Sequence, residues 1–217
     1  MKIIVFGAAG SGKGSLAKML ARDYSIPHIS SGEIFRENMK SGTPLGLSAE
    51  KYVLAGQLVP DIITAQVISN RLEADDCLDG YLLDGFPRTF PQAQMLGDLT
   101  DIDYVIHIIV TEETALARLA GRYMCRNCQI IHNSRWDDVS KCRVCESELY
   151  QRDDDKENVI RKRLEDYQCQ VTPILDYFRD VKNCRILEVQ SNLEDTPEHV
   201  YDRFMGLYKS ELEDGIH

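Results

Sequence analysis

Short apolar runs recur along the chain, each bounded by glycine, proline or charged residues. They cover residues 2–6, 26–30, 80–84, 104–110 and 185–189, and the run at 104–110 is the clearest. Apolar runs of this length without polar alternation are typical of strands that are buried on both faces. The pattern therefore predicts five core strands.

Between these runs, apolar residues recur at the three- and four-residue spacing of amphipathic helices. The predicted helices cover residues 15–24, 32–40, 45–55, 61–73, 112–121 and 197–212, with a long helix from residue 155. Pro173 should kink or interrupt the long helix. Strands alternating with helices predict an α/β fold with a mainly parallel sheet covered on both faces. Residues 122–154 keep neither period and are predicted to be an insertion.

The 217 residues carry 35 acidic and 25 basic side chains, for a formal net charge of −10. We expect no nucleic-acid partner, because a phosphate backbone binds basic surfaces. No run of 18 apolar residues occurs, so we expect no membrane partner, and the first apolar run is too short for a signal peptide. Seven cysteines without a leader segment suggest a reducing, cytoplasmic location.

A glycine-rich segment lies between the first predicted strand and the first predicted helix. It reads Gly7-Ala-Ala-Gly-Ser-Gly-Lys13, with Gly14 where the G-x-x-x-x-G-K-[ST] motif has Ser or Thr. Glycines let backbone N–H groups curl around phosphate oxygens, and the following helix points its N-terminus at them. This context favours a phosphate-binding loop over a glycine-rich turn with a chance lysine. Asp84, at the end of the third strand, either suits Mg²⁺ held through water or caps a turn.

Six arginines fall at the ends of predicted elements: Arg36, Arg88, Arg118, Arg122, Arg152 and Arg163. One arginine in such a place is usually a solvated side chain. Six in a chain with a phosphate loop point to phosphoryl transfer, which needs positioned cations rather than covalent chemistry. No general base stands out. None is required if the acceptor is itself a phosphate anion, whereas a sugar or alcohol acceptor would need one.

Two Cys-x-x-Cys pairs lie in the insertion. The four cysteines are Cys125, Cys128, Cys142 and Cys145. Residues 129–141 separate the pairs by 13 residues, slightly below the usual 15–20. Four thiolates predict a closed, structural Zn²⁺ site rather than a catalytic one. The alternatives are free thiols, two disulfides, or iron or cobalt on the same ligands, with His132 as a reserve ligand.

These motifs resemble those of the adenylate kinase family, and the resemblance covers essentially the whole chain. The family's phosphate loop, G-x-P-G-x-G-K-G-T, corresponds to residues 7–15, with Ala9 for Pro and Ser15 for Thr. Its S-T-G-D-x-x-R segment corresponds to residues 30–36. Its specific signature, D-G-F-P-R-T-x-x-Q-A, is complete at residues 84–93. Losing the proline should reduce the rigidity of the loop, whereas Ser15 keeps a hydroxyl for phosphate.

The resemblance implies a role for each candidate residue. The catalytic cations would be Lys13, Arg88, Arg122, Arg152 and Arg163. The residues for ATP would be Gly10, Ser11, Gly12, Lys13, Gly14, Ser15, Arg118 and Arg122, with Arg118 against the base. The residues for AMP would be Ser31, Arg36, Val59, Gly85, Arg88, Gln92, Arg152 and Arg163. Glu33 and Asp84 would hold Mg²⁺ through water, and Asp154 and Asp155 would orient the arginines.

The resemblance also implies a fold and an activity. The fold would be a three-layer P-loop fold on a five-stranded parallel sheet of order 2-3-1-4-5. Residues 1–29, 60–121 and 155–217 would form the core, 30–59 a helical AMP-binding domain and 122–154 a small lid resembling a zinc ribbon. The enzyme, a monomer, would reversibly transfer the γ-phosphoryl group of Mg·ATP to AMP, giving two ADP. Lid closure would exclude water, which competes as acceptor.

Two rival functions are weaker. A signalling P-loop NTPase would need a water-positioning Gln in a switch-like segment, and it leaves residues 84–93 unexplained. A zinc ribbon that binds nucleic acid is disfavoured by the net charge and by the acidic run at 153–155. Within the resemblance, Thr89 together with Gln92 favours AMP over a pyrimidine monophosphate, because pyrimidine kinases usually carry Asn in place of Thr89.

Overall fold

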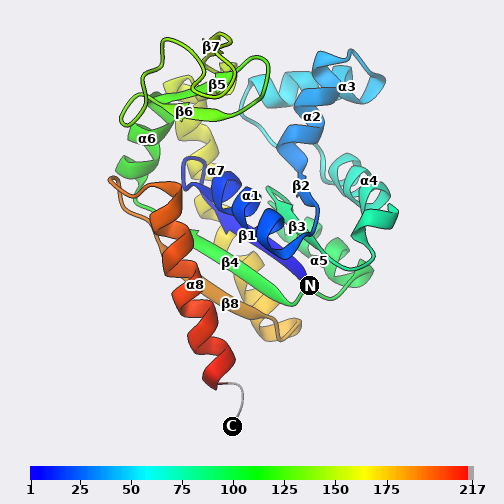
Figure 1. The fold of residues 1–217 in the computed structure, drawn as a ribbon. Coiled ribbons are helices and arrows are strands. Elements are labelled where there is room, and N and C mark those ends of the chain that lie inside the picture. Colours follow the sequence, from blue (N-terminus) through cyan, green and yellow to red (C-terminus); the bar gives the residue numbers. More distant parts are fainter. Residues whose placement is uncertain (215–217) are drawn as a thin grey trace.

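The computed structural model describes residues 1–214, and a five-stranded parallel sheet lies at its centre (Figure 1). The strands are β1 (Lys2–Gly7), β2 (His28–Ser30), β3 (Tyr81–Asp84), β4 (Tyr104–Ile109) and β8 (Arg185–Gln190). Their order, β2-β3-β1-β4-β8, is the expected order 2-3-1-4-5 once the three strands of the insertion are left out of the count. The predicted α/β fold is confirmed, although the last three residues of the expected core segment, 215–217, lie outside the described residues.

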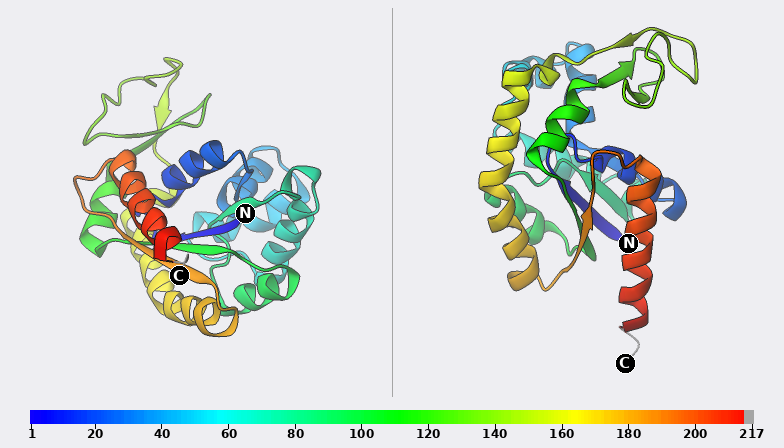
Figure 2. Two further views of the ribbon diagram at one scale, coloured as in Figure 1. Left: turned by 60° about the horizontal axis from the view of Figure 1, so that its bottom comes forward. Right: turned by 90° about the vertical axis from the view of Figure 1, so that its left-hand side faces the viewer.

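Helices cover both faces of the sheet, and Figure 2 shows α7 and α8 on opposite sides of it. The long helices are α1 (Lys13–Tyr24), α2 (Ser31–Lys40), α3 (Pro44–Leu54), α4 (Asp61–Leu72), α5 (Phe90–Leu99), α6 (Glu112–Ala120), α7 (Glu157–Asp176) and α8 (Pro197–Asp214). Short helical turns are η1 (Asp75–Cys77), η2 (Asp153–Asp155) and the wider η3 (Tyr177–Val181).

Alternation along β1 divides the core into two layers. Ile3 and Val5 pack with residues of α1 and α8, whereas Ile4 and Phe6 pack with residues of α4, α5 and α7. Successive side chains of a strand point to opposite faces, so one short apolar run supports both layers. This is why the central strands show no polar alternation in the sequence.

Helix α7 is not interrupted at its proline. Pro173 lies inside the helix, which continues to Asp176 before the wider turn η3 begins. Ile174 and Phe178 on either side of that junction are buried in the core. Their packing holds the chain in a helical path past Pro173, whereas the expected kink stays a prediction.

Two insertions extend from the carboxyl edge of the sheet. Helices α2 and α3 pack around a small apolar cluster of their own, centred on Phe35, Ala49 and Val59. The second insertion is a three-stranded antiparallel sheet of order β6-β5-β7, made of β5 (Arg122–Cys125), β6 (Ile131–Asn133) and β7 (Leu149–Tyr150). Its strands are too short to show a period in the sequence.

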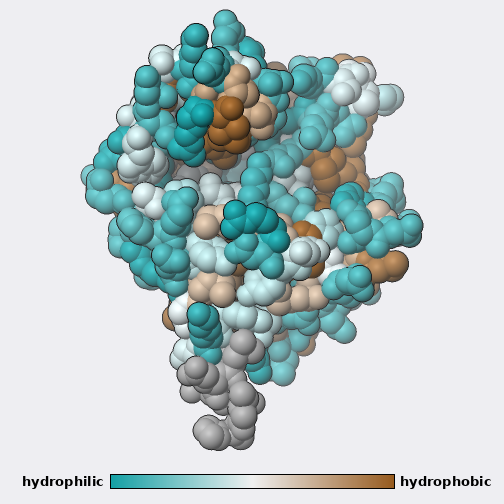
Figure 3. Space-filling view, viewed as in Figure 1, coloured by the Kyte–Doolittle hydropathy of each residue, from teal (hydrophilic) through white to brown (hydrophobic). Residues whose placement is uncertain are grey.

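Hydrophilic residues cover most of the face seen in Figure 1, and hydrophobic ones gather in small patches, one of them on the second insertion (Figure 3). Among the helices of the described residues, none has the length and apolar character needed to span a bilayer.

Candidate active site

A cleft opens at the carboxyl edge of the sheet, between the core and the two insertions. Parallel strands bring their carboxyl ends to one edge, so Gly7, Ser30 and Asp84 end side by side. The cavity there has a volume of about 430 Å³, within the range of small-molecule sites. The residues predicted for nucleotides and Mg²⁺ all line it except Ser11, which is fully buried.

The glycine-rich segment forms a tight loop that joins β1 to the N-terminus of α1. Gly10 has a φ of +83°, and a Cβ there would lie 2.7 Å from the carbonyl oxygen of Ala115. Gly12 also has a positive φ, +92°. Only glycine adopts this path readily, which leaves the backbone N–H groups and the end of α1 free to face an anion.

Lys13 lies among cations in this cleft, and its Nζ donates to the carbonyl oxygen of Ala8 at 3.2 Å. Burial lowers the pKa of Lys13 to about 7; the carboxylate of Asp84 opposes the shift, and Arg88, Arg163 and Arg122 reinforce it. A cluster of cations that depresses a lysine pKa is matched to a highly anionic ligand, which would restore the charge.

Asp84 lies at the base of the cleft and is almost fully buried. Burial acts to raise the pKa of its carboxyl, but the hydrogen bond from His28 and the charge of Lys13 outweigh it, so the pKa lies below the ordinary value. His28 Nε2 is 3.3 Å from Asp84 Oδ2. The carboxylate is therefore ionised at neutral pH and suits a hydrated cation. Sequence reasoning missed His28, because its link to Asp84 depends on the pairing of β2 with β3.

Two aspartates hold the arginines of the second insertion and of α7. Arg122 Nε donates to Asp155 at 2.8 Å, and Arg152 Nε donates to Asp154 at 2.7 Å. Arg163 contacts both carboxylates, at 3.0 Å and 3.5 Å. Although burial acts to raise the pKa of Asp154, Arg152 and Arg163 lower it well below its usual range. Three guanidiniums are thus brought to one side of the cleft.

A second group of polar residues surrounds Gly85, which also lines the cleft. Its carbonyl oxygen accepts hydrogen bonds from Ser31 Oγ at 2.6 Å and from Arg88 Nε at 2.7 Å. Gln92 is buried; its side chain accepts from the N–H of Arg88 and donates to Asp61. Arg36 lies nearby, and burial lowers its pKa to about 10. Four of the residues expected to bind AMP, namely Ser31, Gly85, Arg88 and Gln92, are thus linked by hydrogen bonds.

Arg118 has contacts that the sequence did not indicate. Its buried guanidinium donates to the carbonyl oxygen of Ser11 at 3.3 Å and to Ser191 Oγ at 3.0 Å. It also donates to the carbonyl oxygens of Asn192 and Asp195. Arg118 therefore ties the phosphate loop to the segment after β8, while it lines the cleft. Its predicted contact with the ATP base stays a prediction.

Glu33 is the more exposed of the two carboxylates expected to hold Mg²⁺. It lines the cleft and forms an ion pair with Lys18 at 3.0 Å. Glu33 therefore has a cation of its own, whereas Asp84 faces Lys13 and His28, and the expected contact of both with Mg²⁺ stays a prediction.

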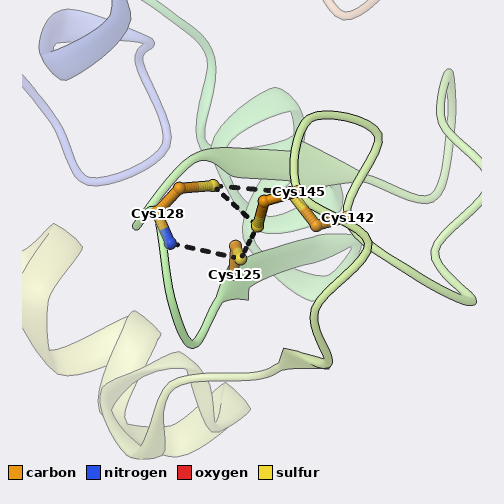
Figure 4. A group of neighbouring side chains, drawn as sticks. All are labelled: Cys125, Cys128, Cys142 and Cys145. Atoms are coloured by element: carbon orange, nitrogen blue, oxygen red, sulfur yellow. Dashed lines mark hydrogen bonds between the residues drawn. The ribbon is translucent and has the colours of Figure 1, made fainter.

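The four cysteines of the second insertion form one compact group, with their side chains turned toward one another (Figure 4). All four sulfur atoms lie within 4.8 Å of one another, and Cys125 Sγ is 3.3 Å from Cys145 Sγ. Tetrahedral Zn–S bonds of about 2.3 Å place sulfur atoms about 3.8 Å apart, so the group fits Zn²⁺ with small adjustments. Hydrogen bonding to Ser147 lowers the pKa of Cys145, whereas, against a backbone hydrogen bond with Ile130, burial and hydrogen bonds with the other three thiols raise the pKa of Cys128. His132 is not part of the group.

Comparison with known proteins agrees with this geometry. The sequence model of the family described as adenylate kinase matches residues 5–183. The chain belongs to the adenylate kinase family. It is 42% identical to an adenylate kinase of Caldicellulosiruptor bescii over 208 residues, which cover 92% of this chain and 97% of that protein. It is 44% identical to an adenylate kinase of Clostridium botulinum over 188 residues, which cover 83% and 87%.

Membership in the adenylate kinase family gives the class of reaction. The chain is an enzyme, a nucleoside monophosphate kinase that transfers a phosphoryl group between nucleotides. The rival interpretations as a signalling NTPase or a nucleic-acid-binding ribbon do not account for a match that spans most of the chain.

Proposed function

We propose that this chain reversibly transfers the γ-phosphoryl group of Mg·ATP to AMP and forms two ADP. The observation that carries the proposal is the convergence of Lys13 and of all six predicted arginines on a single cleft. The phosphate loop and Arg122 would bind ATP, and the cluster around Gly85 would bind AMP. Two anionic substrates could thus meet between them, with Arg152 and Arg163 close to both.

In this proposal the protein acts by position and charge. Phosphoryl transfer spreads negative charge over the equatorial oxygens, and fixed cations stabilise that charge without reorganisation. Asp154 and Asp155 keep three guanidiniums oriented before substrates arrive. Asp84 and Glu33 would hold Mg²⁺ through water, and the ion would neutralise charge on the phosphates. The acceptor, a phosphate anion, needs no general base.

Two mobile inserts on one core complete the proposal. Residues 30–59 would bind AMP, and residues 122–154, which we call the lid, would close over ATP. Residues 1–29, 60–121 and 155–217 would form the core, and the enzyme would act as a cytoplasmic monomer. Closure would remove water, which competes with AMP for the phosphoryl group.

With ATP and AMP together, ADP should form more than about 100-fold faster than ATP is hydrolysed without AMP, because a bound acceptor replaces water in the closed cleft. A coupled assay with AMP, CMP, UMP and GMP as acceptors measures both rates and the preference. AMP should be the best acceptor if Gln92 and the backbone near Val59 read adenine. Equal rates of hydrolysis and transfer would contradict the kinase proposal.

The lid cysteines should hold about one zinc ion per chain, as four thiolates do in structural sites. Elemental analysis of reduced protein, purified without chelators, measures the content. Replacing Cys145 by serine should remove the metal, whereas the matched change at Cys169, an exposed cysteine on α7, should leave it in place. Protein that holds iron or no metal would overturn the zinc assignment.

A further inference from the structure

One carboxylate in the lid links parts of the chain that belong to different Cys-x-x-Cys pairs. Asp137 lies in the turn after β6, and its side chain is only 14% exposed. Its Oδ2 accepts the backbone N–H of Asn133 at 2.9 Å, and its Oδ1 accepts from the guanidinium of Arg143. Asn133 ends β6, and Arg143 lies between Cys142 and Cys145.

The first of these contacts is continuous with the first cysteine pair. Strand β6 pairs with β5, which ends at Cys125, and the N–H of Cys125 donates to the carbonyl oxygen of Ile130. The turn itself is closed by the N–H groups of Trp136 and Asp137, which donate to the carbonyl oxygen of Asn133 at 3.0 Å and 2.8 Å. Asp137 is therefore held rigidly on the half of the lid that carries Cys125 and Cys128.

The second contact reaches the other cysteine pair. The Arg143 side chain is 60% exposed, and an exposed ion pair alone contributes little to stability. The ion pair instead fixes the position of a turn, because Arg143 belongs to the four-residue turn that carries Cys142 and Cys145. The two halves are also joined beside the cysteines by the pairing of β5 with β7, at Cys125 and Leu149, and by the N–H of Arg126, which donates to the carbonyl oxygen of Glu148 at 3.0 Å. Asp137 joins them through the segment 134–141.

Among its described contacts Asp137 touches none of the four sulfur atoms, so it would act on them through the backbone segments that it links. Groups that orient the surroundings of metal ligands in this way typically change metal affinity by about 10- to 100-fold when they are removed.

We propose that Asp137 is a positioning residue of the lid metal centre, which holds the two cysteine pairs in the arrangement that a tetrahedral ion needs. The inference rests on the zinc site proposed above and concerns residues outside the ligand set. Asp137 adds to the pairing of β5 with β7 in keeping the four sulfur atoms within 4.8 Å of one another, in a lid with only 13 residues between its cysteine pairs.

The test measures zinc affinity of the full chain by competition with a chromophoric chelator, under reducing conditions. Asp137→Asn should weaken zinc binding about tenfold. The matched control is Asp138→Asn, which removes the same charge one residue away; Asp138 is exposed and accepts only the N–H of Ser140 among the described residues. That control should stay within about twofold of the wild type, since the carboxylate is solvated. Equal affinities of the two variants would overturn the proposal.

A second variant covers a failure of Asp137→Asn to fold. Arg143→Gln changes an exposed side chain and should also weaken zinc binding. In the double variant, the fold-loss of zinc affinity should not exceed the product of the fold-losses in the two single variants. Unchanged affinity in Arg143→Gln would also overturn the proposal. A wild type that binds no zinc would refute the metal site itself, and ADP formation, assayed separately, tests the phosphoryl transfer without reference to Asp137.

Discussion

Replacing Arg88 by lysine should lower kcat/KM for AMP by about 10²- to 10³-fold, although the positive charge is kept. Arg88 follows β3, and its Nε donates to the carbonyl oxygen of Gly85 at 2.7 Å. That bond fixes the guanidinium plane and leaves the terminal N–H groups for two oxygens of one phosphate. A lysine ammonium is a point charge on a flexible stem, so it cannot keep both bonds at once.

The matched control for Arg88 is Arg161→Lys on α7. Arg161 is exposed and pairs with Glu157 at 2.8 Å, so its replacement should change kcat/KM by less than about twofold. Steady-state assays of ADP formation with varied AMP give both values. Near-normal activity of Arg88→Lys would remove Arg88 from the acceptor phosphate site.

The core of the fold could be predicted because strand burial and helix periodicity are local signals. The apolar run at 104–110 became β4 and the run at 185–189 became β8, and their parallel pairing follows from the alternation with helices. The path of α7 past Pro173 could not be predicted, because burial of Ile174 and Phe178 depends on elements far away in the sequence. Neither could the lid sheet, whose two- to four-residue strands carry no period.

Residues of the candidate site could be predicted where they lie close together in the sequence and form a motif. The glycine-rich loop and the segment 84–93 contribute part of the cleft lining, including Lys13, Asp84 and Arg88, and the cysteine spacing names the four sulfur atoms that the structure brings together. The contacts that support these residues were not predictable. His28 meets Asp84 through strand pairing, and Arg118 meets Ser191 across 73 positions of sequence. Such partners are set by the tertiary fold and leave no local pattern.

Replacing Lys13 by methionine should lower kcat/KM by about 10³-fold, at least as much as replacing Arg88 by lysine. Methionine keeps the length of the side chain but removes the charge that, in the proposed function, would face the transferring phosphate. The matched control is Lys209→Met on α8, an exposed lysine, which should retain activity within about twofold.

The lowered pKa of Lys13 also predicts that ATP binding is coupled to the uptake of a proton, which a purely structural residue would not cause. In the open cleft its pKa is about 7, and the ATP phosphates should raise it toward the ordinary value of about 10.4. At pH 8 the free enzyme then holds mostly neutral Lys13, so ATP binding should take up nearly one proton; at pH 6 the lysine is already charged and contributes almost none. Titration calorimetry in two buffers of different ionisation enthalpy measures the uptake. The Lys13→Met variant should lose it at pH 8 and Lys209→Met should keep it, whereas a wild type without uptake at pH 8 would mean that Lys13 is charged before the nucleotide arrives.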